Sequence, residues 1–254
     1  MKATSIPDYE RTFAQNGVDS SGKKFTFQDL NLPIGNTNQT IDIKQCKLES
    51  VPKNFFYEQK TDKRKIVLHF TMGYLKGDIA TLTGSDHVSV PFVIARNGTI
   101  YNLFSSSFWS YHLGPGASGG NTRMSQESIG IEISNIGPLR LNGTNLTSVY
   151  SNTDVYCKLT EKSFYVEQNS KVRGYQYYAT FTNAQYASVV RLVKYLTARY
   201  NIPEVVVDDP AGLMSDTDFA AFSGIVTHTN CRQDKTDIGP AFDWQRFKDG
   251  LLNF

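Results

Sequence analysis

The chain has 254 residues, of which 40% are hydrophobic and 20% are charged, and its formal net charge at pH 7 is +2. This composition is typical of a globular protein and argues against a fibrous repeat or a disordered chain. The small charge, without a basic run or stripe, argues against a nucleic-acid partner. The length suffices for one domain with a small appendage, which is the organisation that we expect.

The composition of individual segments also bears on two further classes, membrane proteins and exported proteins. No segment approaches about 18 continuous apolar residues, so we expect no membrane span. The N-terminal stretch MKATSIPDYERTF lacks the apolar core of an export signal, so the chain as given predicts no signal peptide. Localisation stays unknown, because the protein could be cytoplasmic before release or be exported from a longer precursor. Three widely spaced cysteines argue against a disulfide framework.

Residues 1–62 are rich in Asn, Gln, Lys, Ser and Thr and show few periodic apolar stretches. They predict an N-terminal appendage of irregular structure or short strands. The stretch TFQDLNLPIG favours one short strand that ends at Pro33, and TIDIKQCKL favours another. This segment could anchor substrate, cap a sheet edge or mediate dimerisation.

The main domain is predicted to span residues 63–254. KIVLHF is a continuous apolar run that indicates a central strand covered on both faces. VPFVIARNGTIYNLF predicts an antiparallel hairpin, because Asn-Gly between two apolar runs is a strong turn signal. SIGIEIS at 128–134 and VVV at 205–207 are further predicted strands.

Residues 183–200 predict a helix, since Val189, Leu192, Val193 and Leu196 recur at helical spacing. Two insertions are expected, at about 137–178 and at 208–223, the first with an edge strand at 175–178. The order of strands and helices predicts an α/β (α+β) fold in which a mixed central β-sheet is flanked by helices.

The stretch HTNCRQDKTDIGPAFDW brings an imidazole, a thiol, a lysine and carboxylates into one segment. A catalytic zinc usually takes three protein ligands and leaves a fourth position open. His69, at the end of KIVLHF, together with His228 and Asp237 would supply such a set. Cys231 is the rival third ligand, although a buried structural thiol is its more common role. Each histidine taken alone is more often a structural residue than a ligand.

The stretches KIVLHFT, VPFVIARNGTIYNLF, YHLG, SIGIEIS, NAQYASVVRLVKYL and HTNCRQDKTDIGPAFDW resemble, in this order, the type 2 N-acetylmuramoyl-L-alanine amidases. That superfamily includes phage lysozyme-like amidases and peptidoglycan recognition proteins. The resemblance covers roughly residues 64–248 and implies a mixed sheet flanked by helices that presents a zinc-binding cleft. It also implies cleavage of the amide between muramic acid and L-alanine in peptidoglycan or a muropeptide.

The resemblance implies one Zn2+ per chain, held by His69, His228 and Asp237. Glu132 and Lys235 match the glutamate and lysine of the family motifs. Hydrolysis needs a base for the attacking water, a role that suits Glu132, and positive charge for the oxyanion, a role that suits Lys235. His112 in WSYHLG matches a histidine at the cleft wall and is expected to contact substrate, with a structural role as the alternative. Trp109 and Tyr111 could line the groove.

The chain departs from the family pattern at Thr227, where glycine is usual, at Ile238, where proline is usual, and in VSVPFVI, which has no tyrosine. The alternative function is a recognition protein of the same fold that binds muropeptides without cutting them. A convergent, unrelated metallohydrolase is a third interpretation. An endolysin, an autolysin and a recycling enzyme all fit the leading one.

Overall fold

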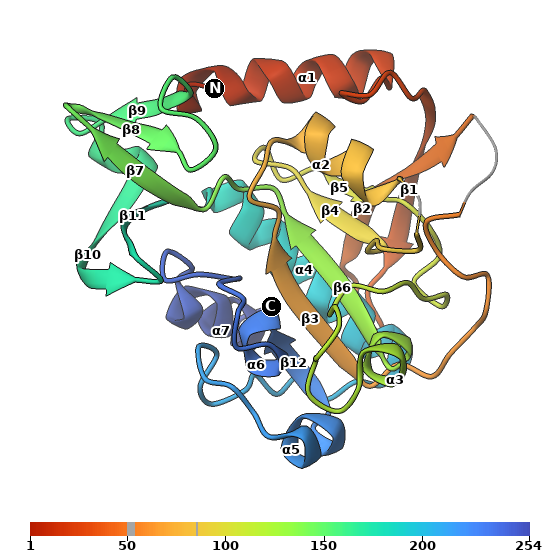
Figure 1. The fold of residues 1–254 in the computed structure, drawn as a ribbon. Helices are drawn as coiled ribbons and strands as arrows, with labels where there is room; N and C mark the ends of the chain where they lie inside the picture. Colours follow the sequence, from red (N-terminus) through yellow and green to blue (C-terminus); the bar gives the residue numbers. More distant parts are fainter. Residues whose placement is uncertain (50–53, 85) are drawn as a thin grey trace.

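The computed structural model describes residues 1–49, 54–84 and 86–254. Its main element is a mixed sheet with the strand order β1-β2-β5-β4-β6-β3-β12 within those residues (Figure 1). The bounds are β1 Phe25–Pro33, β2 Thr40–Leu48, β3 Lys65–Phe70, β4 Phe92–Ile94, β5 Ile100–Asn102, β6 Ser128–Ile133 and β12 Gly224–Thr227. The strands from β12 through β3 and β6 to β4 run parallel, and β4 pairs antiparallel with β5. The predicted fold class is confirmed.

Strand β3 lies inside the sheet between β6 and β12, and all six of its residues are buried. This is the central position that the continuous apolar run predicts. In the register with β6, His69 lies directly opposite Glu132. Because side chains alternate along a strand, paired residues project from the same face of the sheet.

The predicted hairpin is present, with β4 and β5 joined by a loop in which Gly98 adopts a positive φ of 88°. A side chain at this position would also collide with Ala184 and Ser188 on the helix behind it. Glycine is therefore required here both for the turn and for close packing of the helix.

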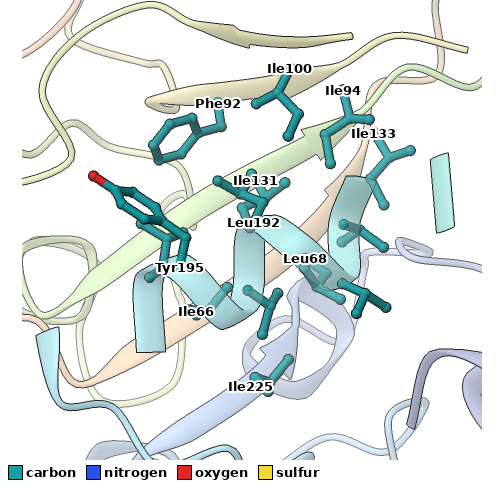
Figure 2. Packing of buried hydrophobic residues seen from close by; sticks show 14 of the residues in the cluster. Ile66, Leu68, Phe92, Ile94, Ile100, Ile131, Ile133, Leu192, Tyr195 and Ile225 are labelled. Atoms are coloured by element: carbon teal, nitrogen blue, oxygen red, sulfur yellow. The ribbon is translucent and has the colours of Figure 1, made fainter. Parts of the chain in front are cut away.

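One face of the sheet is covered by α4 (Asn183–Tyr200) and α7 (Trp244–Leu252). The isoleucine and leucine side chains of β3, β4 and β6 pack against α4 on this face (Figure 2). Thr182 and Gln185 form a capping box at the start of α4. The alternation that turns Leu68 and Ile131 toward α4 sends His69 and Glu132 to the opposite face.

The opposite face carries the helices α1 (Ile6–Asn16), α2 (Leu75–Leu82), α3 (Asn121–Gln126) and α5 (Asp216–Ala221). The chain also contains α6 (His228–Cys231), η1 (Ala3–Ser5) and η2 (Lys162–Phe164). None of the described helices combines the length and hydropathy needed to cross a bilayer.

The prediction of irregular structure or strands was wrong for the first residues, which form α1. Ile6, Glu10 and Phe13 are buried at helical spacing on one side of α1, and the polar residues between them obscured this pattern. Strands β1 and β2 are present, and β1 ends at the predicted Pro33. They extend the main sheet through pairing of β2 with β5. Residues 50–53 of the predicted appendage lie outside the described residues.

The segment predicted as an insertion at 137–178 contributes most of a second sheet, with the order β10-β11-β7-β8-β9. Its strands are β7 Pro138–Asn142, β8 Asn145–Ser148, β9 Val155–Lys158, β10 Tyr165–Val172 and β11 Tyr175–Ala179. The expected edge strand at 175–178 is wrong in position, because β11 pairs with β10 on one side and with β7 on the other. The strand expected at 205–207 is reduced to one parallel bridge between Val206 and Ile225, in which Ile225 N–H donates to Val205 and Val207 N–H donates to Ile225.

Candidate metal centre

Two segments far apart in sequence meet where β3 and β12 end. His69 is the fifth residue of β3, and His228 is the first residue of α6, directly after β12. Thr227 caps α6 by a capping box with Asn230, and its hydroxyl also donates to the carbonyl of Pro210. The departure from glycine at position 227 therefore supplies the N-cap that fixes the backbone of His228.

Asp237 is brought to the two histidines by the loop that follows α6. The hydroxyl and the backbone N–H of Thr229 both donate to its carbonyl oxygen, at 2.7 and 3.2 Å. His69, His228 and Asp237 are all buried, and within the described part of the chain they form the group of side chains that could hold a metal ion. The structure thus brings together the three residues that the sequence selects as ligands.

The three ligand atoms form a small triangle. His69 Nδ1 lies 3.0 Å from His228 Nδ1 and 2.9 Å from Asp237 Oδ2, and His228 Nδ1 lies 3.0 Å from the same oxygen. Atoms bound tetrahedrally to zinc at about 2.0–2.1 Å lie about 3.3 Å from one another. The sides of the triangle are therefore close to those of a zinc-binding face.

A contact outside the triangle orients His228 for metal binding. His228 Nε2 lies 2.8 Å from the carbonyl oxygen of Leu113, which only accepts, so this nitrogen carries a proton. In the neutral tautomer that this contact selects, Nδ1 of His228 turns a lone pair toward the triangle, where Asp237 Oδ2 is also an acceptor. Lone pairs that converge in this way suit a shared cation, so the residues present fit a bound zinc ion.

The electrostatics agree with this donor set. Burial lowers the pKa of His69 to about 4, which leaves its imidazole neutral near pH 7. For Asp237, burial opposes ionisation, but contact with His228 and His69 outweighs it and holds the pKa of the carboxyl well below its usual range. His69 and Asp237 are therefore present as neutral imidazole and ionised carboxylate, the forms that bind metals.

Glu132 lies beside the triangle on β6. Burial, followed by the negative charges of Asp237 and Asp78, holds its pKa well above the usual range. Its Oε2 atom is buried and has no hydrogen-bond partner among the described residues. A buried carboxyl oxygen without a partner is costly, and groups perturbed in this way concentrate at functional sites.

A cleft of about 450 Å3 opens over these groups. It is lined by the three candidate ligands and by Glu132, Lys235 and His112, so every site residue selected from the sequence reaches this cleft. Tyr111 lines it as well, whereas Trp109 is buried and stacks on Tyr57, with 4.2 Å between the ring centroids.

Cys231 is not a member of the ligand group. Burial raises the pKa of its thiol to about 12, and the sulfur lies 3.3 Å from the carbonyl oxygen of His228. A protonated, hydrogen-bonded thiol has the structural role considered for it above.

Two residues of this region escaped the sequence analysis. Tyr150, in the loop between β8 and β9, is 70% exposed and lines the cleft, and only the fold of the second sheet brings it there. Ser128 is buried at the start of β6 and contacts His112. The sequence could have placed Ser128 on the same sheet face as Glu132, because residues of a strand alternate between the two faces and Ser128 lies four residues before Glu132.

Comparison with known proteins agrees with this geometry. The family model described as N-acetylmuramoyl-L-alanine amidase matches residues 59–240. N-acetylmuramoyl-L-alanine amidase AmiD of Escherichia coli (strain K12) is 29% identical over 187 residues, which are 71% of this chain and 50% of that protein. The chain therefore spans half the length of this curated relative.

Solved structures with a similar chain path include AmiD from E. coli in complex with the substrate anhydro-N-acetylmuramic acid-L-Ala-D-gamma-Glu-L-Lys. It is 21% identical with a TM-score of 0.49, over 87% of this chain and 65% of that one. AmpDh3 from Pseudomonas aeruginosa, in complex with anhydromuramic pentapeptide, is 18% identical with a TM-score of 0.47, over 80% and 66% of the two chains.

Proposed function

The chain belongs to the N-acetylmuramoyl-L-alanine amidase family, and from this premise we propose that it hydrolyses, with zinc, the amide bond between N-acetylmuramic acid and L-alanine in peptidoglycan. The observation that carries the proposal is the convergence of His69 Nδ1, His228 Nδ1 and Asp237 Oδ2 within 3.0 Å of one another. The family model and the amidase relative support the substrate class.

His69, His228 and Asp237 would hold the ion. Bound zinc supplies a Lewis acid that polarises a carbonyl group and makes water more acidic. The remaining chemistry falls to two side chains in the same cleft. Glu132 would accept the proton of the attacking water, because its Oε2 has no hydrogen-bond partner among the described residues. Lys235 contributes a fixed positive charge for the oxygen anion that develops on the amide carbonyl.

The alternative of a recognition protein that binds without cutting is less well supported. The resemblance associates that subgroup with loss of a zinc ligand. In this chain the three ligand positions carry competent side chains that converge, and the candidate base lies beside them. This arrangement favours catalysis.

The direct test is digestion of purified cell walls by the zinc-loaded protein. We expect new L-alanine amino termini, detected by amine labelling and mass spectrometry, without new reducing sugar ends. Reducing ends in their place would identify a glycosidase and overturn the proposal. Parallel digestion of intact sacculi and of soluble muropeptides would distinguish a lytic role from a recycling role.

The ligand set is tested by His228→Ala. We expect near-stoichiometric zinc in the wild-type protein, and loss of both zinc and cleavage in a folded variant, measured by elemental analysis and circular dichroism. Full retention of zinc in this variant would contradict the assigned metal site.

A further inference from the structure

A series of hydrogen bonds runs from Nε2 of His69, on the side of the ring away from the metal centre, into the protein. His69 Nε2 lies 3.1 Å from His112 Nδ1, His112 Nε2 lies 2.9 Å from Ser128 Oγ, and Ser128 Oγ lies 2.6 Å from the carbonyl oxygen of Met124. These hydrogen bonds therefore join a ligand of the metal centre to the backbone of α3 through the side chains of His112 and Ser128.

The direction of every proton in this series follows from its last member. A carbonyl oxygen only accepts, so the Ser128 hydroxyl donates to Met124. Ser128 Oγ must then accept from His112 Nε2–H, which leaves a lone pair on Nδ1 of a neutral His112. That lone pair accepts from His69 Nε2–H. The proton of His69 is thereby held at Nε2, and its Nδ1 lone pair faces His228 and Asp237.

We propose that His112 is a positioning residue that, anchored by Ser128, fixes the tautomer and ring orientation of His69 for metal binding. The inference rests on the proposed function, because it concerns the same metal centre. It gives His112 a different role from the substrate contact that the sequence suggests, since both of its ring nitrogens are used by the protein. Outer partners of this kind make an imidazole a better ligand and reduce its freedom.

The sheet is shaped to admit the His112 ring. A Cβ atom at Gly130 would lie 3.1 Å from His112 Nδ1 and 2.5 Å from Val90 Cγ1. Gly130 stands on β6 between Ser128 and Glu132, on the face that carries both. The glycine of SIGIEIS thus leaves room for the imidazole against the strand, which indicates that the ring packs in a defined position.

The test measures zinc affinity by competition with a chromogenic chelator, independently of catalysis. We expect Ser128→Ala and His112→Phe to weaken zinc binding by about 10- to 100-fold, the usual effect of losing an outer-shell partner. His112→Asn should weaken it less, because the amide oxygen can still accept from His69. A packing role alone predicts the reverse order, since phenylalanine preserves the ring volume that asparagine loses.

Ser110→Ala is the matched control. Ser110 is also buried and donates to the main-chain carbonyl of Ser89 at 2.6 Å, but it takes no part in the hydrogen bonds that link His69 to Met124. We expect its zinc affinity to stay within about twofold of wild type. If His112→Phe does not fold, Ser128→Ala carries the test. Zinc affinity in the folded Ser128 variant equal to that of the Ser110 variant would overturn the inference.

Histidine tautomers provide a second readout. Long-range 1H–15N spectra of the metal-free protein should show His69 protonated at Nε2 in the wild type and a mixture of tautomers in Ser128→Ala. An unchanged tautomer would contradict the proposed role. A wild-type protein that binds zinc but does not cut peptidoglycan would refute the proposed function and leave this test valid, whereas one that binds no zinc would refute both.

Discussion

Replacement of Glu132 by glutamine should stabilise the metal-free protein while abolishing catalysis. The Oε2 atom of Glu132 is buried without a partner among the described residues, and nearby Asp237 and Asp78 disfavour its charge. An unsatisfied buried polar group costs about 1–3 kcal/mol, and more when it is ionised. The neutral amide removes the charge but keeps the shape, so we expect a gain of about 1–3 kcal/mol at neutral pH.

The sign of the pH dependence follows from linkage. The pKa of Glu132 is raised in the folded state, so the folded protein binds its proton more tightly than the unfolded chain does. Wild-type stability therefore falls as pH rises above the ordinary glutamate pKa of 4.5. Below that pH both side chains are neutral, and the advantage of the variant should vanish. Subtracting the wild-type stability from that of the variant removes the effect of histidine titration, because both proteins contain the same histidines.

The measurement is chemical unfolding in the presence of a chelator at pH 4 and pH 8. Glu167→Gln serves as control, because Glu167 is exposed and pairs with the exposed Lys162 at 3.6 Å, so its loss should lower stability by about 0–1 kcal/mol. A Glu132→Gln variant no more stable than wild type at pH 8 would refute the reasoning. With zinc supplied, the variant should keep its metal and lose about 100- to 10,000-fold in cleavage rate, the usual range for a general base. Wild-type turnover would remove Glu132 from that role.

Three further outcomes are expected. Lys235→Met should retain zinc and lose about 100- to 1,000-fold in kcat, measured on a soluble muropeptide, because it removes one stabilising charge of the oxyanion; unchanged kcat would exclude that role. Removal of zinc by a chelator should lower the unfolding free energy by about 2.7 kcal/mol relative to protein with free zinc at 100 times its Kd, as scanning calorimetry would show; an unchanged Tm would argue against a tightly bound ion. Leu68→Ala, on the fully buried central strand, should cost about 2–5 kcal/mol in denaturant unfolding, and a cost below 1 kcal/mol would contradict the packing described.

The sequence predicts the middle of the main sheet well, because its strands carry signals that depend on a few neighbouring residues. KIVLHF is apolar throughout and lies between two strands, and Asn97-Gly98 marks a turn that few other residue pairs form. Helix α1 carries a weaker apolar pattern, because the charged Glu10 occupies one of its buried positions. Its burial of Glu10, whose carboxylate accepts the backbone N–H groups of Arg96 and Asn97, depends on a hairpin more than eighty residues away.

In the candidate site, too, the residues with a distinctive chemical type could be predicted and their tertiary contacts could not. His69, His228 and Asp237 could be selected because zinc restricts the residue types that bind it, although their convergence depends on the whole sheet. The link between His112 and Ser128 could not be predicted, since hydrogen bonds between loops and strand ends leave no periodic pattern in the sequence. Tertiary contacts of this kind require coordinates.

The arrangement of charge in the cleft bears on the choice between cutting and mere binding. The cleft brings together the ionised Asp237, the imidazoles of His69 and His228, and Glu132, whose buried Oε2 atom has no hydrogen-bond partner among the described residues. A bound cation would offset this accumulation of acceptors, whose mutual repulsion otherwise costs stability. A protein that only binds muropeptides gains nothing from Glu132 in such a place, because an apolar residue there would relieve the penalty. Hydrolysis does need a carboxylate beside the metal, so the destabilising residue is itself an argument for catalysis.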